Sequence, residues 1–401
     1  MLRSDWRITL FKFFIISNVI DAAGTLKIKY ISSLLLLLTI FMRKKIKLGI
    51  YEFILLVLFP MVAVPYSYFI CDVSLGAAIS AVTFCLGIIY YIAIINEKKI
   101  TDGMLMFFVN FMTGLSYIIL MIFVIALILQ ITGNQSYYWT VGGYLQHKLK
   151  LGFFGYNYIG SIYMPIVYFK SSMFLIFAFA GACFYEKRKS IIILFLANML
   201  VSTTANIVFT VPILIYYFIK KIKPRMKSKY VFSFFLLGSS IMGIMILFFD
   251  KLYEKLYGFI SDMTLQSSSS MVKIGHITSI LEVLLNDVKS LLFGMGGGSS
   301  FYSSYLQYKV VNSEVSQLEC LRRFGIIFTS IFFLYIFLII YSLYKTNKKI
   351  LACGLLMLFL ATASNPQLLS PMFLIILAMC KEVKTKKQNR VGIKWGGSFY
   401  G

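Results

Sequence analysis

The sequence is poor in charged residues, and above all in acidic ones. Asp, Glu, Lys and Arg make up 13% of its 401 residues, with 15 Asp or Glu against 39 Lys or Arg. A soluble domain carries about a quarter charged residues, so the composition excludes an ordinary soluble protein. Apolar residues reach 59% and aromatic residues 17%, which indicates a polytopic membrane protein.

Patterns for disulfides and metals are lacking as well. The six cysteines are scattered, without a Cys-x-x-Cys pair, and the chain has two histidines. We therefore expect no disulfide framework, no metal site and no cofactor. A cleavable signal-peptide pattern and a 20–50-residue repeat are also missing, so the first apolar stretch is predicted to be a membrane span.

The positive charge is gathered in short clusters between apolar runs. Such clusters stay on the cytoplasmic side of a membrane, so they predict a topology with both termini in the cytoplasm. Because the clusters lie at span ends, they favour a membrane explanation of the net charge of +24 over nucleic-acid binding. The clusters are residues 43–47, 98–99, 187–189, 220–229, 345–349 and 381–390.

Apolar blocks of about 20 residues predict an all-α fold with about twelve membrane spans. The blocks at 191–219 and 350–380 have basic residues at both ends, so each is expected to hold two spans, divided at 202–206 and at Asn365-Pro366. The other spans are predicted at 8–24, 28–42, 48–70, 74–95, 104–131, 171–185, 230–249 and 324–344. Residues 1–401 then form one membrane domain with enlarged outer loops at 132–170 and 250–323 and a basic cytoplasmic tail at 381–401.

The longer outer loop carries the most unusual sequence. Residues 271–292 have apolar residues at helical spacing and predict an amphipathic helix at the membrane interface. The glycine-rich run 293–300 follows it. Dense glycines leave backbone amides facing outward, as in phosphate-binding turns, although a plain turn is the alternative. The run is not a P-loop, because no Gly-Lys-Ser/Thr follows it.

A second helix is predicted from Val311 into the span at 324–344, with Glu314 and Leu318 on one face. Arg322 and Arg323 lie at the outer end of this span, against the positive-inside trend. Arginines in such a place have a partner, which is an acidic side chain, a lipid phosphate or a substrate phosphate. The sequence alone leaves these three alternatives open.

The first outer loop is rich in aromatic residues. It contains Tyr137, Tyr138 and Trp139, and a run of aromatic residues and glycines at 152–160. Aromatic side chains are common at membrane interfaces, which is the more general explanation. They also stack on sugars, which suits an enzyme that handles glycans.

Taken together, these features resemble the Wzy-type O-antigen polymerases and, more distantly, the O-antigen ligases. The family has two enlarged outer loops and a polar helix entering a span. Lys150 and Lys273 stand where the family commonly has Arg, and residues 202–206 lack the Arg of a Ser-x-Ser-Arg-like element. The matching positions are Glu314, eleven residues before Gly325; Lys273 with Leu292-Phe293-Gly294-Met295-Gly296; and Lys150 with Gly152, Phe154, Asn157 and Gly160.

The resemblance implies a GT-C-like, metal-independent glycosyltransferase in the bacterial inner membrane. Its substrates would be undecaprenyl-diphosphate-linked oligosaccharides in the lipid bilayer, and its expected partners a chain-length regulator and a flippase of the same pathway. Glu314 is expected to be the catalytic base, with a solvated surface glutamate as the alternative, and His276 a second acid/base group. The residues expected to bind diphosphate or glycan are Lys148, Lys150, Asn157, Lys273, Gly294, Gly296, Arg322 and Arg323.

Three other functions are open to a chain of this kind. An O-antigen ligase has similar chemistry, but ligases carry His where this chain has Glu314. A flippase or transporter of lipid-linked sugars places charged residues within its spans, whereas here Lys12 and Asp21 in the first span are among the few. A membrane scaffold would leave both the glycine-rich run and the outer arginines without a reason.

Overall fold

The computed structural model describes residues 5–41, 50–95, 101–159, 162–201, 204–222 and 268–382, and it is largely helical. The predicted span at 230–249, the first part of the second outer loop at 250–267 and the tail from residue 383 lie outside the described residues. Residues 202–203, within the predicted break at 202–206, lie outside them as well.

The first five apolar blocks each become helix close to their predicted bounds. Pro60 and Pro65 have no N–H to donate, and the helix of the third block changes to the wider π form on both sides of them. The elements of this half are α1 Asp5–Ile20, α2 Ile28–Phe41, α3 Ile50–Phe53, η1 Ile54–Leu58, α4 Phe59–Pro65, η2 Tyr66–Ile70, α5 Leu75–Ala81, η3 Thr83–Cys85, α6 Leu86–Ile95 and α7 Thr101–Ile131.

The two blocks predicted to be divided are divided. One helix ends at Leu200 and the next begins at Thr204, while the last block breaks between Ala361 and Pro371. The helices after the first outer loop are η5 Ser172–Phe174, α9 Leu175–Phe184, α10 Arg188–Leu200, α11 Thr204–Ile222, α16 Ser316–Lys345, α17 Lys349–Ala361, η7 Thr362–Ser364 and α18 Pro371–Glu382.

The core of the molecule is formed by helices that are apolar on every side. All side chains of α9 from Leu175 to Cys183 are buried, and α18 is buried from Met372 to Cys380. A helix that is hydrophobic all round belongs in the interior of a protein or a membrane. α9 packs against α7, α10, α11 and α17, which places it at the centre of the helices in the second half of the chain.

Several outer helices instead turn large apolar side chains away from the protein. On α7, Ile118, Met121, Ile125 and Ile128 are all about half exposed, and their spacing puts them on one face. In the described part of the chain, the helical segments Gly103–Ile131 and Ser316–Lys345 are long and apolar enough to cross a membrane.

The all-α prediction is wrong for the outer loops, which contain two antiparallel hairpins. β1 Gly152–Ile159 pairs with β2 Ile162–Phe169, and β3 Phe301–Ser303 pairs with β4 Tyr308–Val310. The sequence from 153 to 168 is dense in aromatic and β-branched residues, which favour strands. The helices α8 Gln135–Gly143 and η4 Tyr144–Lys148 precede the first hairpin.

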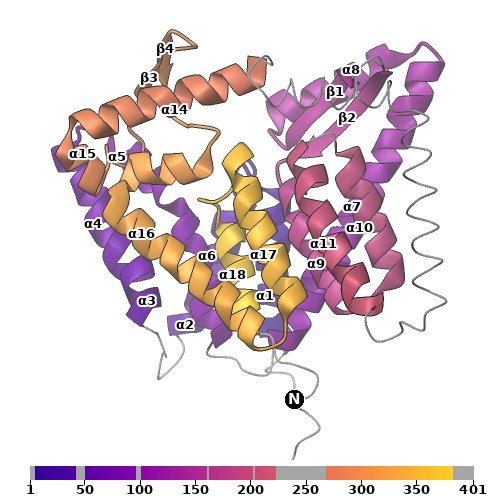
Figure 1. Ribbon diagram of the computed structural model, residues 1–401, viewed down its shortest axis with the longest axis horizontal. Helices are drawn as coiled ribbons and strands as arrows, with labels where there is room; N and C mark the ends of the chain where they lie inside the picture. Colours follow the sequence, from indigo (N-terminus) through magenta and orange to yellow (C-terminus); the bar gives the residue numbers. More distant parts are fainter. Residues whose placement is uncertain are drawn as a thin grey trace, which may run out of the picture.

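Both outer loops gather at one end of the molecule. Figure 1 shows α8 and the β1–β2 hairpin at the same end as the β3–β4 hairpin and the helix α14, Ser268–Asn286. The predicted amphipathic helix is present, but it breaks at Asp287, whose carboxylate accepts hydrogen bonds from the amides of Lys289 and Ser290 at 3.1 Å. Asp287 thereby caps a separate short helix, α15 Val288–Phe293.

Candidate active site

A small apolar core holds α14 over the start of α16. Ile280, Leu284 and Phe301 are buried together, and residues of α15 and α16 pack against them. His276, Ile280 and Leu284 recur every four residues, so they lie on the one face of α14 that points into this core. The folded loop therefore forms a platform in which α14, the β3–β4 hairpin and the first turns of α16 are fixed relative to one another.

Arg322 lies at the bottom of this platform and is fully buried. Its Nε donates to Glu319 Oε2 at 2.9 Å and its Nη2 to Glu319 Oε1 at 2.8 Å, which is a bidentate pair. Nη1 donates to the carbonyl and hydroxyl of Ser299 at 3.0 and 2.8 Å, and Nη2 also donates to Val311 O at 2.9 Å. All five guanidinium N–H groups are used, so Arg322 serves as a framework residue with no donor left for a substrate.

Glu319 is the acidic partner that sequence reasoning missed. Besides Arg322, its carboxylate accepts hydrogen bonds from Arg323 Nε and from the amide of Ser313, the latter at 3.2 Å. Burial alone acts to raise the pKa of Glu319, but the hydrogen bonds and charges of Arg322 and Arg323 outweigh it and hold the pKa below its ordinary value. The spacing of three and four residues in a helix was the available signal for these pairs.

The loop before α16 is folded back by these contacts, which corrects the prediction of a helix from Val311. The helix begins at Ser316, two residues after Glu314, and it does not run straight into the predicted span, because it is kinked at Gly325, where φ is +71° and the backbone is not helical. Because Arg322 binds Val311 O and Glu319 binds the Ser313 amide, the chain from 311 to 313 closes over the first turns of α16. Glu314 is therefore presented from a loop rather than from a helix face.

Glu314 meets Lys273 of α14 on the surface of the platform. Lys273 Nζ lies 3.9 Å from Glu314 Oε2, and the two side chains are 28% and 46% exposed. Arg323 follows Arg322 and is part-buried. Its Nε donates a hydrogen bond to Glu319, and its Nη2 donates one to Asn312 Oδ1. The cations and the carboxylate that the sequence analysis proposed as a site are thus partly brought together, with Lys273 and Glu314 accessible from outside.

His276 lies one turn along α14 from Lys273 but is buried, with 3% of its surface exposed. Its ring packs edge-on against Phe301 at 5.3 Å between centroids, and neither ring nitrogen has a hydrogen-bond partner in the described part of the chain. Burial lowers the pKa of His276, while the charges of Glu314 and Glu319 act in the opposite direction. The ring is therefore neutral at pH 7 and lies beneath the surface on which Glu314 is exposed.

The glycine-rich run is packed tightly between the platform and the helices below it. Gly294 has φ of +84°, and a Cβ there would lie 2.4 Å from Arg323 O. The amide of Met295 donates to Arg322 O at 2.7 Å, and that of Gly297 to Ser67 Oγ at 2.8 Å. Gly296 also has positive φ, and its Cβ would lie 2.9 Å from that of Cys71. These contacts give the glycines a packing role, because no side chain fits where the chain passes so closely.

The first-loop candidates lie on and beside the β1–β2 hairpin. Lys148 and Lys150 are exposed just before β1, and Asn157 lies within β1, opposite Met164 in β2. The hairpin is anchored to the helices by tyrosine hydroxyls: Tyr156 donates to Ala126 O at 2.8 Å and Tyr138 to Ile166 O at 2.6 Å. Trp139 remains 46% exposed on the outer surface.

The two outer loops are joined through the turn between α17 and α18. Tyr168 Oη in β2 donates to Asn365 Oδ1 at 3.0 Å, and Ser316 Oγ donates to Asn365 O at 2.8 Å. Ser316 is the first residue of α16 and follows Glu314 by two positions. Asn365 therefore connects the foot of the first hairpin with the segment that presents Glu314.

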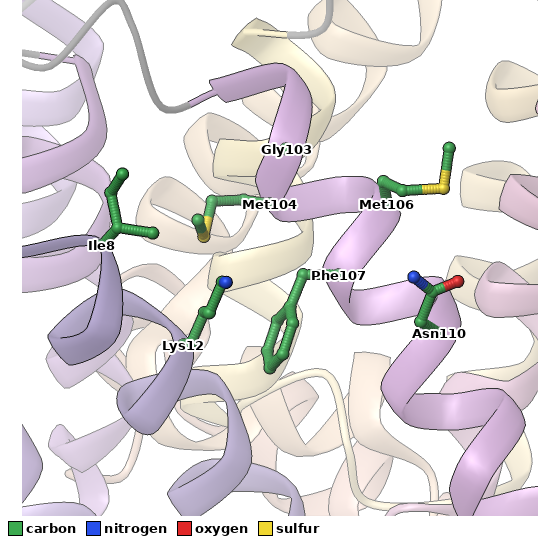
Figure 2. Close-up of a pocket in the computed structure, with 7 residues that line it drawn as sticks. All are labelled: Ile8, Lys12, Gly103, Met104, Met106, Phe107 and Asn110. Carbon is green, nitrogen blue, oxygen red and sulfur yellow. The ribbon is translucent and has the colours of Figure 1, made fainter. Parts of the chain in front are cut away.

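A cavity of about 320 Å³ lies elsewhere, between α1 and α7 (Figure 2). Lys12 points into it, with Nζ 5.3 Å from the centre of the Phe107 ring. Its lining lies near the start of α7, and the hairpin is joined to the other end of this 31-residue helix. At 1.5 Å per residue, α7 spans roughly 45 Å, so the cavity is not part of the platform. The lining residues are Ile8, Lys12, Gly103, Met104, Met106, Phe107 and Asn110.

Comparison of the chain with protein-family models, with curated protein sequences and with solved structures finds no match. In the part of the chain that the structure describes, no group of three or more His, Cys, Asp or Glu side chains is placed to hold a metal ion.

Proposed function

We propose that this chain is a polytopic membrane glycosyltransferase of the O-antigen polymerase type. It would join oligosaccharide repeat units carried on undecaprenyl diphosphate at the periplasmic face of the inner membrane, without a metal. The proposal includes a GT-C-like arrangement of about twelve spans with both termini in the cytoplasm. A chain-length regulator and a flippase of the same pathway are its proposed partners.

The membrane part of the proposal is supported by the outward apolar faces and by the agreement between apolar blocks and helices. α7 and α16 are long enough to span a bilayer. Both elaborated loops lie at one end of the molecule (Figure 1), as a single reaction face requires.

The observation that carries the enzymatic proposal is the exposed Lys273–Glu314 pair on the platform. Sugar transfer needs a base for the attacking hydroxyl and positive charge for the departing diphosphate. Glu314 and Lys273 supply one of each, 3.9 Å apart and 41 positions apart in the sequence. The fixed platform beneath them keeps the two groups together without a substrate.

In the proposed reaction, a sugar hydroxyl of one lipid-linked unit attacks the anomeric carbon of the growing glycan. The new C–O bond forms as the bond from that carbon to the diphosphate breaks, with inversion at the carbon. The hydroxyl proton passes to the Glu314 carboxylate, and the diphosphate leaves with the bonding electron pair. Lys273, and Arg323 beside the platform, offer positive charge to the leaving group.

The other candidates take supporting roles in this scheme. His276 is buried and neutral, so the proposal gives proton acceptance to Glu314 and leaves His276 as a group beneath it. Lys148 and Lys150 add positive charge at the first loop, where Asn157 is a proposed glycan contact. Trp139 offers an exposed ring on which sugars can stack.

The test is complementation of a polymerase-deleted strain of the same serotype, read from the lipopolysaccharide ladder. Wild type should restore the ladder, and Glu314→Gln should leave core plus one unit, because an amide cannot accept the proton. Glu282→Gln is the matched control, since Glu282 is an exposed glutamate of α14. A full ladder from Glu314→Gln would remove Glu314 as the base, and no ladder from membrane-inserted wild type would refute the polymerase proposal.

A further inference from the structure

The foot of the β1–β2 hairpin brings two lysines together from opposite strands. Gly152 pairs with Phe169, and the next contact outward joins the Lys170 amide to Leu151 O at 2.9 Å. Lys170 therefore lies across from Leu151, and Lys150 lies one residue further out on the other side of the hairpin. Lys150 has φ of +52°, a left-handed conformation that residues other than glycine rarely adopt.

A third lysine lies behind them, at the start of α2. Lys29 is buried, and its Nζ donates to Ala22 O at 3.2 Å. Lys170 is close enough for its charge to act on Lys29, and the charge of Lys150 acts on Lys170. The negative charge of the Asp21 carboxylate also acts on Lys29. The charges of Asp21 and Lys170 thus act on Lys29, and that of Lys150 acts on Lys170.

The charges of the lysines repel one another at this position, and Lys29 is buried and Lys170 half-buried, while Lys150 is exposed. Burial lowers the pKa of Lys170, and the neighbouring charge of Lys150 lowers it further. A bound anion would relieve both effects, because it replaces lost hydration and separates the like charges. Lysine is a common ligand of phosphate, to which it presents a compact charge.

We propose that Lys150 and Lys170, supported by Lys29, form a binding site for a phosphate-class anion at the foot of the hairpin. The site lies where α2 begins, so the natural source of such an anion is the headgroup of a membrane lipid. Tyr168 lies in β2, two residues before Lys170, and it is hydrogen-bonded to Asn365, which Ser316 also contacts. Two hydrogen bonds through Asn365 therefore connect Tyr168, near the proposed site, with the segment that carries Glu314.

Two lipids share this chemistry: bulk anionic phospholipid and the diphosphate of a lipid-linked glycan. Assigning the site to the second lipid rests on the proposed function, whereas the anion site itself does not. If the glycan lipid is the ligand, the lysines hold one of the two lipid-linked units while the platform acts on their sugars.

The test begins with the full-length chain in neutral detergent, titrated with inorganic diphosphate by calorimetry. The double variant Lys150→Gln/Lys170→Gln is expected to bind at least about tenfold more weakly, since two charge-assisted contacts are lost. The control Lys289→Gln/Lys309→Gln removes two exposed lysines of the second loop and should stay within about twofold of wild type. Arginine at both positions, in Lys150→Arg/Lys170→Arg, should retain binding.

Equal affinity in the glutamine variant and the control would overturn the site. If the double variant does not fold, the single variant Lys150→Gln gives the same test, because Lys150 is exposed. Neutral phosphatidylcholine nanodiscs with either phosphatidylglycerol or undecaprenyl diphosphate then distinguish the sources. A loss confined to undecaprenyl diphosphate identifies the lipid-linked substrate, and an equal loss identifies bulk lipid. Failure of the ladder assay with intact diphosphate binding would refute the polymerase while leaving this site in place.

Discussion

Replacing Glu319 with alanine removes the carboxylate that neutralises the fully buried guanidinium of Arg322. Four hydrogen bonds disappear with it: two from Arg322, one from Arg323 and one from the Ser313 amide. The bonds from Arg322 to Ser299 and Val311 remain, but they carry no negative charge. The second-loop platform should therefore be strongly destabilised by Glu319→Ala.

The size of the effect follows from the burial of the pair. Removing one partner of a buried ion pair costs about 3–5 kcal/mol, because the other charge is left without compensation. The three remaining bonds of Arg322 argue for the lower end, about 3 kcal/mol. That value corresponds to a roughly hundredfold increase in the population of the locally opened platform.

Amide hydrogen exchange measures this opening directly. Residues 293–303 are the reporter, because the Met295 amide donates to Arg322 O and Arg322 itself binds Ser299. Exchange there should be about a hundredfold faster in Glu319→Ala, while Glu282→Ala, at an exposed glutamate of α14, should leave it unchanged.

A double variant separates the loss of charge balance from the loss of packing. Glu319→Leu/Arg322→Met replaces the whole pair with apolar groups, and it should exchange more slowly than Glu319→Ala. Protection in Glu319→Ala equal to that of wild type would refute the argument that Arg322 depends on this carboxylate.

Two further predictions concern the same platform. Burial holds the pKa of His276 below its ordinary value of 6.5, so the unfolded chain binds a proton on this side chain more readily than the folded chain does. The stability of the platform should therefore fall as the pH drops below about 6.5. His276→Leu should remove this part of the pH dependence of amide exchange between pH 7 and about 5. Constant protection in wild type across that range would contradict it. Gly294→Ala should lower the melting temperature or prevent folding, because a Cβ there would lie 2.4 Å from Arg323 O at a φ of +84°. Gly114→Ala, where a Cβ meets nothing within 4 Å, should change stability by less than about 1 kcal/mol.

The sequence alone determined where most of the described helices lie. α7 occupies 101–131 against a predicted 104–131, and the break at 202–206 falls where α10 gives way to α11. Apolar blocks and their interruptions are local properties of the chain, so these features can be read without knowing what packs against what. The predicted amphipathic helix after residue 271 was correct for the same reason, up to its cap at Asp287.

The tertiary structure decided how the candidate residues are used. The sequence left three kinds of partner open for Arg322 and Arg323. In the folded protein both arginines form ion pairs with the buried carboxylate of Glu319. The glycines of the turn at 293–300 are held by groups such as Ser67, which is 230 residues from Gly297. Lys29, Lys150 and Lys170 are spread over more than a hundred residues; the hairpin brings Lys150 and Lys170 together, and the packing of α2 adds Lys29. Such pairings depend on which surfaces meet after the helices pack, and no local pattern in the chain records that outcome.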